Sequence, residues 1–386
     1  MAMTRGQVPA KAPRMMDPRT DPGADLLPEG LEDRLPQSAA AAMRIEQAVL
    51  QVLHAHGYDR VRPPMIEFEK SILRRMTVQT RHMFRFVDPK SLRMLALRSD
   101  MTPQIGRIAA TSLAGRPRPL RLCYAGQVAR MVGNMLDPRR ENLQLGAELV
   151  GSDTVEAAAE IVELAIASLA ASAPGSISVD FALPDLVDTL AENAGLSPDQ
   201  VQAVRRELDS KDAGGLVAAG GEAFLPLLYA SGPFEDAIEK LAAIDVSGVL
   251  ASRIEALRQI AARVQGRARL TLDPSERHGF EYQSWFGFAV YVDGVRTALG
   301  RGGTYMIRGS DEAATGFSLY PEELVEVVKS AEPRRDALFL PLGHDRAAAA
   351  RLRDAGWRTV AALSDEDDAL SLGCSHRLQG DSPVAL

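Results

Sequence analysis

The chain has 386 residues, of which 46% are hydrophobic and 25% charged, a balance typical of soluble globular proteins with two or three domains. Its formal net charge of −7 lowers the expectation of nucleic-acid binding, which draws much of its affinity from cationic side chains. No apolar run reaches the roughly 20 residues of a membrane helix, and residues 1–25 lack the apolar core of a secretory signal. We therefore expect a cytoplasmic protein without membrane association, whose two cysteines are reduced thiols.

The N-terminal part predicts a tail, a helix and a strand in that order. Prolines, glycines and scattered charges indicate a poorly ordered tail over residues 1–25. Residues 36–56 predict a helix that ends before Gly57. Its apolar positions, at helical spacing, are Met43, Ile45, Val49, Leu50 and Leu53. Residues 58–69 predict a strand that is broken at a Pro-Pro pair.

A hairpin and a second helix follow. Residues 83–87 and 93–98 alternate as two strands, and the intervening DPKS supplies turn residues. Thr102 then precedes Pro103 as the expected cap and first-turn residue of a helix.

Residues 118–151 are the most informative segment and predict strand, polar loop and strand. The first strand ends in Arg130, and the second carries Gln144 and Glu148. These two side chains share one face by the strand period of two. An antiparallel hairpin of this kind would present an arginine and two polar groups to a small ligand.

The rest of the chain divides by pattern. An Ala-rich helix and an alternating strand precede residues 184–265, which are strongly helical and predict an inserted module. Strand patterns return from residue 267 and end in a helix near residue 331. Residues 333–386 predict a small βαβ unit. We therefore expect a core over residues 26–325 that contains the insertion, followed by a short α/β unit.

Several short motifs resemble histidyl-tRNA synthetases in both content and order. They are LPEG, YDRVRPP, LRSDMTP, the Arg130 hairpin, HGFEYQS, GRGGTYM and TGFSLYPEEL. The resemblance implies an α+β fold of the class II aminoacyl-tRNA synthetase type, with an antiparallel sheet flanked by helices. It also implies a homodimer formed through the first class II motif, around Pro63 and Pro64.

The resemblance also assigns a histidine-like pocket. Asp100 and Thr102 occupy the positions that bind the amino group. Gln144 stands at the position that contacts the substrate amide group, and Glu148 at one that contacts or supports the ring. Tyr282 belongs to the aromatic patch of the same pocket.

Three further positions of the pocket carry basic side chains. Arg130 suits a phosphate or a carboxylate equally well. The family's catalytic arginine should directly precede Gly279, and here His278 stands in that place. Arg277 is one residue earlier, and a shift of one residue would turn it to the opposite face of a strand.

The residues that would hold ATP are absent. Val132 replaces an acidic residue that reads adenine, and Asn142 replaces the aromatic ring that stacks on it. Glu323 replaces an arginine that lies over the triphosphate, and such cations stabilise the transition state of adenylate formation. Aminoacylation activity is therefore not expected, and no catalytic residue, metal or cofactor is assigned.

A synthetase-like chain with these losses is similar to the regulatory subunits of ATP phosphoribosyltransferase. That resemblance implies a short-form catalytic partner, histidine as feedback effector, a role in histidine biosynthesis and no tRNA binding. A divergent histidyl-tRNA synthetase and a stand-alone histidine-sensing module remain the alternatives.

Simpler structural roles also remain open for the candidate residues. Arg130 could form a structural ion pair, and Gln144 with Glu148 could be a buried polar pair that supports the hairpin. Tyr282 could equally be a core residue.

Overall fold

The computed structural model describes residues 26–75, 82–133, 138–276, 283–331 and 336–386. The tail expected over residues 1–25 lies outside these ranges, as do Arg277, His278 and Tyr282. The chain divides into two compact units, Met1–Lys329 and Ser330–Leu386.

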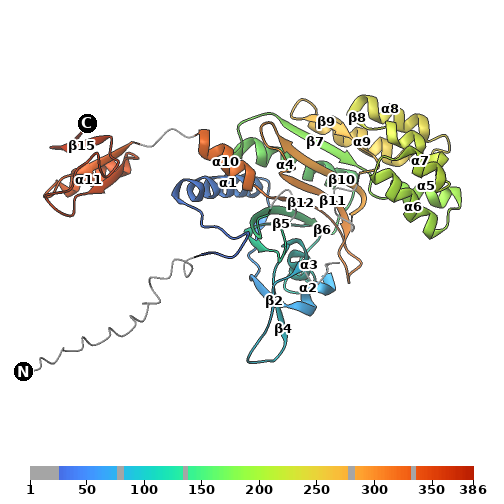
Figure 1. Ribbon diagram of the computed structural model, residues 1–386, viewed down its shortest axis with the longest axis horizontal. Helices are drawn as coiled ribbons and strands as arrows, with labels where there is room; N and C mark the ends of the chain where they lie inside the picture. The colour runs from blue at the N-terminus through green and yellow to red at the C-terminus, as the bar shows by residue number, and fades with distance from the viewer. Residues whose placement is uncertain (1–25, 76–81, 134–137, 277–282, 332–335) are drawn as a thin grey trace, which may run out of the picture. The chain divides into compact units, whose positions relative to one another are not determined.

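The first unit is built on a nine-stranded sheet with the order β1-β5-β6-β12-β11-β10-β7-β9-β8 (Figure 1). Its central strands, from β5 through β7, pair antiparallel throughout. The strands are β1 (Asp59–Arg60), β5 (Leu120–Ala129), β6 (Glu141–Val150), β7 (Ile177–Ala182), β8 (Gly232–Pro233), β9 (Arg269–Leu272), β10 (Gln283–Val292), β11 (Gly300–Met306) and β12 (Ala313–Leu319). This mainly antiparallel sheet with its helices confirms the predicted α+β class.

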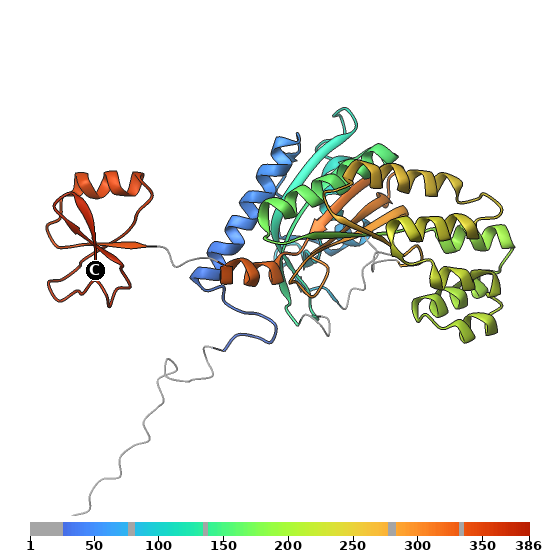
Figure 2. The same cartoon turned by 90° about the horizontal axis from the view of Figure 1, so that it is seen from above.

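Helices α1 (Pro36–Ala55), α4 (Val155–Ser172) and α9 (Ala251–Val264) pack along one face of this sheet (Figure 2). The predicted apolar stripes explain this packing, since Ile45, Val49 and Leu53 are buried in the common core. Met43 is an exception: it is 55% exposed, because the rotation of the helix turns it to the outer face.

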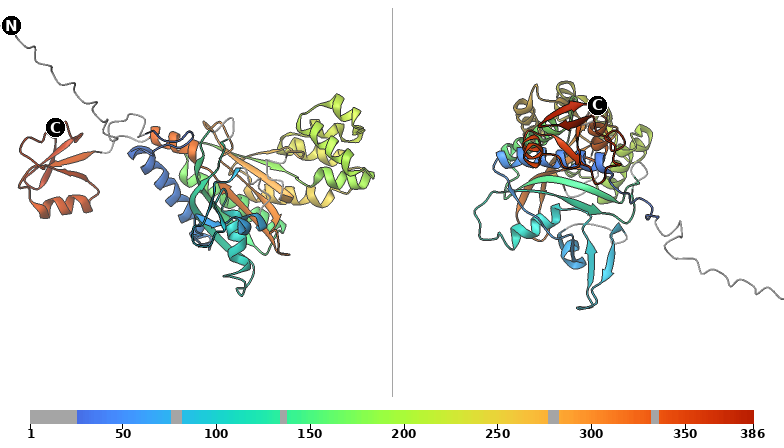
Figure 3. Two further views of the ribbon diagram at one scale, coloured as in Figure 1. Left: turned by 60° about the horizontal axis from the view of Figure 1, so that its bottom comes forward. Right: turned by 90° about the vertical axis from the view of Figure 1, so that its left-hand side faces the viewer.

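The opposite face carries a smaller sheet with the order β2-β4-β3 (Figure 3). Its strands are β2 (Ile66–Phe68), β3 (Arg85–Val87) and β4 (Met94–Leu97), with helix α2 (Glu69–Arg75) beside them. The predicted hairpin is confirmed. The strand pattern over residues 58–69 is broken at Pro63 and Pro64 as predicted, and the two parts, β1 and β2, belong to different sheets.

Helix α3 (Thr102–Ala110) begins one residue earlier than expected. Met101 is the N-cap, and Thr102 is the first helical residue. Thr102 therefore does not cap the helix, and its hydroxyl is used elsewhere. Asp100 accepts the backbone N–H of Thr102 instead, at 2.9 Å.

The helical insertion contains α5 (Leu186–Ala194), α6 (Pro198–Asp209), α7 (Ala213–Ala218), the 3₁₀ helix η3 (Glu222–Tyr229) and α8 (Phe234–Ile244), followed by α9. It gathers at one end of the sheet (Figure 3, left). Its core continues that of the main sheet, with Phe234 against Phe181 at 5.7 Å between ring centroids. The one departure from the predicted helical character is β8, which adds a short strand to the sheet.

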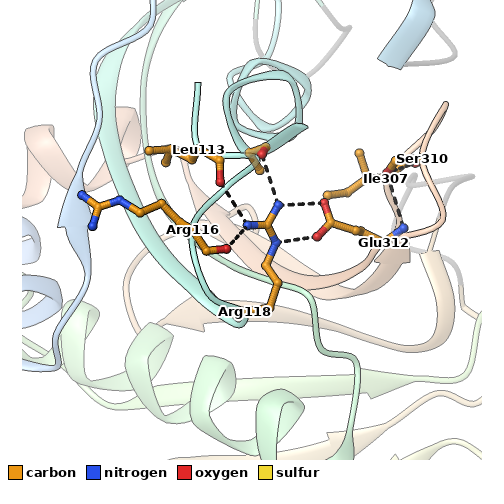
Figure 4. A network of polar contacts seen from close by, with 7 residues as sticks. Leu113, Arg116, Arg118, Ile307, Ser310 and Glu312 are labelled. Atoms are coloured by element: carbon orange, nitrogen blue, oxygen red, sulfur yellow. Dashed lines mark hydrogen bonds and ion pairs between the residues drawn. The ribbon is translucent and has the colours of Figure 1, made fainter. Parts of the chain in front are cut away.

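Arg118 lies just before β5, the first strand of the β5–β6 hairpin, and anchors this segment through its side chain (Figure 4). Its guanidinium donates to both carboxylate oxygens of Glu312, at 2.5 and 3.2 Å. The same group donates to the carbonyls of Ala109, Leu113 and Arg116. This ties the segment after α3 to the turn between β11 and β12.

The second unit has a four-stranded sheet with the order β14-β13-β15-β16. The predicted βαβ unit is present as β13 (Ala337–Leu340), α11 (Arg346–Asp354) and β14 (Arg358–Ala361), with parallel strands. A closing hairpin of β15 (His376–Gln379) and β16 (Ser382–Ala385) was not predicted. Helix α10 (Glu322–Ala331) precedes this unit.

Among the described residues, no helix is long and apolar enough to cross a membrane. The same residues contain no cluster of His, Cys, Asp or Glu that could hold a metal ion. Both cysteines are free and buried.

Candidate functional site

The candidate site lies where the start of α3 meets the middle of β6. Asp100 Oδ1 accepts hydrogen bonds from the backbone N–H of Thr102 and from Gln144 Nε2, each at 2.9 Å. Gln144 Oε1 in turn accepts the backbone N–H of Met101 at 2.8 Å. In the part of the chain that the structure describes, no hydrogen bond reaches Asp100 Oδ2. This anionic oxygen is therefore available to a ligand.

Glu148 forms the second centre of the site and is 1% exposed. Its carboxylate accepts hydrogen bonds from the hydroxyls of Thr102 at 2.9 Å, Tyr124 at 3.2 Å and Tyr305 at 2.8 Å. Burial raises the pKa of the Glu148 carboxyl to about 8, and the hydroxyl donors only partly oppose this effect. The Glu148 carboxyl therefore retains its proton to a higher pH than an exposed glutamate does.

Four residues complete the network: Tyr124, Tyr305, Ser318 and Tyr320. Ser318 Oγ lies 2.9 Å from both the Tyr124 hydroxyl and Gln144 Nε2. Gln144 Nε2 also donates to the Tyr320 hydroxyl at 3.2 Å.

These four residues were not assigned to the site from the sequence. The strand period gave a usable indication for Tyr124, which shares a face with Arg130. A second indication was the Gly-rich run before Tyr305, because such a run marks a strand that other groups approach closely.

Arg130 lies just beyond the end of β5. Its Nε donates to the carbonyl of Ser99 at 3.5 Å, and its guanidinium carbon lies 5.6 Å from the centre of the Tyr320 ring. No carboxylate among the described residues forms an ion pair with it. The structural ion-pair alternative for Arg130 thus finds no support in these ranges.

Glu322 and Glu323, the first two residues of α10, are engaged in contacts with other parts of the protein. Glu322 accepts the backbone N–H of Leu143 at 2.5 Å and pairs with Arg34. Glu323 accepts hydrogen bonds from the Arg296 backbone and from the Thr297 hydroxyl, in the loop before β11. Repulsion of a bound anion by Glu323 therefore finds no support, because its carboxylate is used in these contacts.

The predicted residues Asp100, Thr102, Gln144 and Glu148 thus form one connected network, with Arg130 at its edge. Carboxylates, an amide and hydroxyls suit the recognition of a small polar ligand through hydrogen bonds. The alternative of a buried polar pair is partly correct, because both side chains also form hydrogen bonds to neighbouring strands. Gln144 bonds to Ser318 on β12, and Glu148 bonds to Tyr124 on β5. Yet Asp100 Oδ2 and the Arg130 guanidinium keep hydrogen-bonding capacity that this support does not use.

Comparison with known proteins gives a consistent picture. The family model described as histidyl-tRNA synthetase matches residues 30–324. A protein of Rhodospirillum centenum named ATP phosphoribosyltransferase regulatory subunit is 40% identical, over 95% of this chain and 97% of that protein. One of the same name from Paramagnetospirillum magneticum is 39% identical, over 93% of this chain and 97% of that protein.

Solved structures agree on the fold. A Bacillus halodurans structure described as an ATP phosphoribosyltransferase regulatory subunit/histidyl-tRNA synthetase superposes with a TM-score of 0.77 at 22% identity. It covers 94% of this chain and 97% of that one. Histidyl-tRNA synthetase from Nostoc superposes with a TM-score of 0.75 at 15% identity, over 92% of this chain and 90% of that one.

Proposed function

The chain belongs to the family of ATP phosphoribosyltransferase regulatory subunits, and we propose that it binds histidine at the Asp100–Glu148 network and passes this signal to a short-form catalytic subunit. Membership makes it a regulatory subunit that acts in histidine biosynthesis. The proposal concerns the effector, its location and the absence of aminoacylation.

The observation that carries this proposal is an asymmetry within the site. Groups suited to an ammonium and a polar side chain are connected and buried, as Asp100, Gln144 and Glu148 illustrate. On the ATP side, Asn142 stands where an adenine-stacking ring is expected and Val132 is 62% exposed. A ligand of amino-acid size therefore fits the groups present at the site better than a nucleotide does.

Regulation requires histidine to bind one state of the complex better than another, typically by about 1–3 kcal/mol. The direct test measures turnover of the short-form catalytic subunit with and without this chain, each with and without histidine. We expect turnover to depend on this chain and to fall when histidine is added. A histidine response of the catalytic subunit alone would place the effector site outside this chain.

We expect the purified chain not to exchange pyrophosphate into ATP in the presence of histidine. The reason is that the chain lacks the aromatic side chain that would stack on adenine and the arginine that would contact the triphosphate. Adenylate formation depends on such cations. A radiolabel exchange assay, with an active histidyl-tRNA synthetase as positive control, measures this. Exchange at the rates of ordinary enzymes, on the order of 1–10³ per second, would favour the divergent-synthetase alternative.

A homodimer through the first class II motif is also part of the proposal. The small sheet that follows Pro63 and Pro64 exposes several large apolar side chains, and exposed apolar surface is typical of interfaces. They are Met65, Ile66, Phe86, Val87 and Met94.

Sedimentation at micromolar concentration should show a dimer, and Ile66→Glu should shift it toward the monomer. Ile66 is 44% exposed, so the substitution places a charge on the surface without filling the core. Val246→Glu is the matched control, since Val246 is 93% exposed in a different part of the chain. A parent chain that sediments as a monomer, or equal effects of the two variants, would contradict this interface.

A further inference from the structure

Arg301 is a cation on the site face of the sheet that the network does not use. It lies opposite Ser318 on β12 and opposite Ala289 on β10. Directly paired residues of an antiparallel sheet project to the same face, so Arg301 leaves the sheet on the side of Ser318. Ser318 is hydrogen-bonded to Tyr124 and Gln144 there.

The Arg301 side chain is half-buried and has no hydrogen-bond or ion-pair partner among the residues that the structure describes. Cations in such positions are normally matched by an acid, because removing part of their hydration is costly. Asp180 shares the same row of the sheet, but its Oδ1 accepts from the Thr271 hydroxyl at 2.6 Å. Arg301 is therefore a partly desolvated donor group with no acceptor among the described residues.

A second cation, Arg130, lies near the ring of Tyr320. Burial raises the pKa of Tyr320, while the positive charges of Arg130 and Arg301 both act in the opposite direction. The two guanidinium groups are thus close enough to influence the same hydroxyl. Ser99, whose carbonyl accepts from Arg130, also has a buried hydroxyl without a hydrogen-bond partner among the described residues.

The site consequently brings groups of opposite charge together around Tyr320. Among the described residues, Asp100 Oδ2 accepts no hydrogen bond, and neither Arg130 nor Arg301 forms an ion pair. Gln144 contacts both Asp100 and Tyr320. A zwitterion with adjacent ammonium and carboxylate groups has the matching arrangement of charge.

We infer that Arg301 binds the α-carboxylate of the amino acid held at this site, together with Arg130, and so selects free amino acids over their decarboxylated or reduced analogues. This inference rests on the proposed binding of histidine at the network. A planar guanidinium can donate two parallel hydrogen bonds to a carboxylate, and such charged bonds are among the stronger ones in proteins.

The test compares L-histidine with L-histidinol, which keeps the ammonium and the ring but has an alcohol in place of the carboxylate. Isothermal titration of the full-length chain gives both affinities for the parent and for Arg301→Gln. We expect Arg301→Gln to weaken histidine binding about 10- to 100-fold, the range of a charged hydrogen bond, and histidinol binding by less than about threefold. Arg301→Lys should fall between the two for histidine.

Arg296→Gln is the matched control, since it removes the same charge from an exposed loop and should change neither affinity. Equal weakening of both ligands by Arg301→Gln, or an unchanged histidine affinity, would overturn the assignment of Arg301. Tighter binding of inorganic phosphate than of histidine, lost in Arg301→Gln, would assign the cation to a phosphate instead. Failure of the parent chain to bind histidine would overturn the proposed function and this inference together.

Discussion

Replacing Gly316 with alanine is expected to destabilise the chain by about 3 kcal/mol or more, at the upper end of the cost of overpacking a core. Gly316 is in β12 directly opposite Glu148. An added Cβ would collide with the Glu148 carboxylate and come within 2.8 Å of the Ala147 carbonyl oxygen. Because Glu148 is already held by three hydroxyls, it cannot move aside without breaking the network. Denaturant unfolding, read as the shift of the midpoint, measures the effect.

Gly115→Ala provides the matched control, because Gly115 is exposed and has no atom within 4 Å of an added Cβ. Its midpoint should remain within experimental scatter of the parent. If the collision with Glu148 is the cause, the double variant Gly316→Ala with Glu148→Ser should recover part of the loss. A Gly316→Ala chain as stable as the parent would show that the sheet accommodates a side chain there, and the packing argument would fail.

The sequence predicted those helices and strands in which apolar residues recur at a regular spacing. The hairpin of β5 and β6 follows from alternation, and α4 follows from a helical repeat. The structure adds that Thr154 caps α4, because its side chain accepts the Ala157 N–H. The short β15–β16 hairpin was missed because its few residues are mostly exposed, so that no alternation of apolar and polar side chains marks it.

The site was predicted less completely, for a physical reason. Tyr124, Tyr305 and Ser318 lie on β5, β11 and β12, and only the register of the sheet brings their hydroxyls together. A period of two places each residue on a face of its own strand, but it cannot align one strand with another. Thr102 shows the same limit locally. Its sequence context favoured a helix cap, whereas the position of Glu148 draws its hydroxyl into the network.

Asp100→Asn is expected to weaken histidine inhibition of the complex about 10- to 100-fold while leaving its uninhibited turnover nearly unchanged. The amide Oδ1 of asparagine can still accept the hydrogen bonds that Asp100 receives from Thr102 and Gln144. The fold of the site should therefore persist. What is lost is the negative charge at Oδ2, and a hydrogen bond to a charged group is worth about 1.5–3 kcal/mol. Histidine titrations of turnover in the assembled complex measure the shift.

Asp199→Asn is the matched control, because Asp199 lies exposed in the first turn of α6, in the helical insertion. It removes the same charge and should leave the inhibition curve in place. The comparison separates a local contact from the general effect of net charge, which both substitutions change equally. An Asp100→Asn complex that responds to histidine as the parent does would locate the effector site elsewhere, with the catalytic subunit or the interface between subunits as the next place to test. A complex that loses basal turnover as well would instead make Asp100 part of the route by which this chain activates its partner.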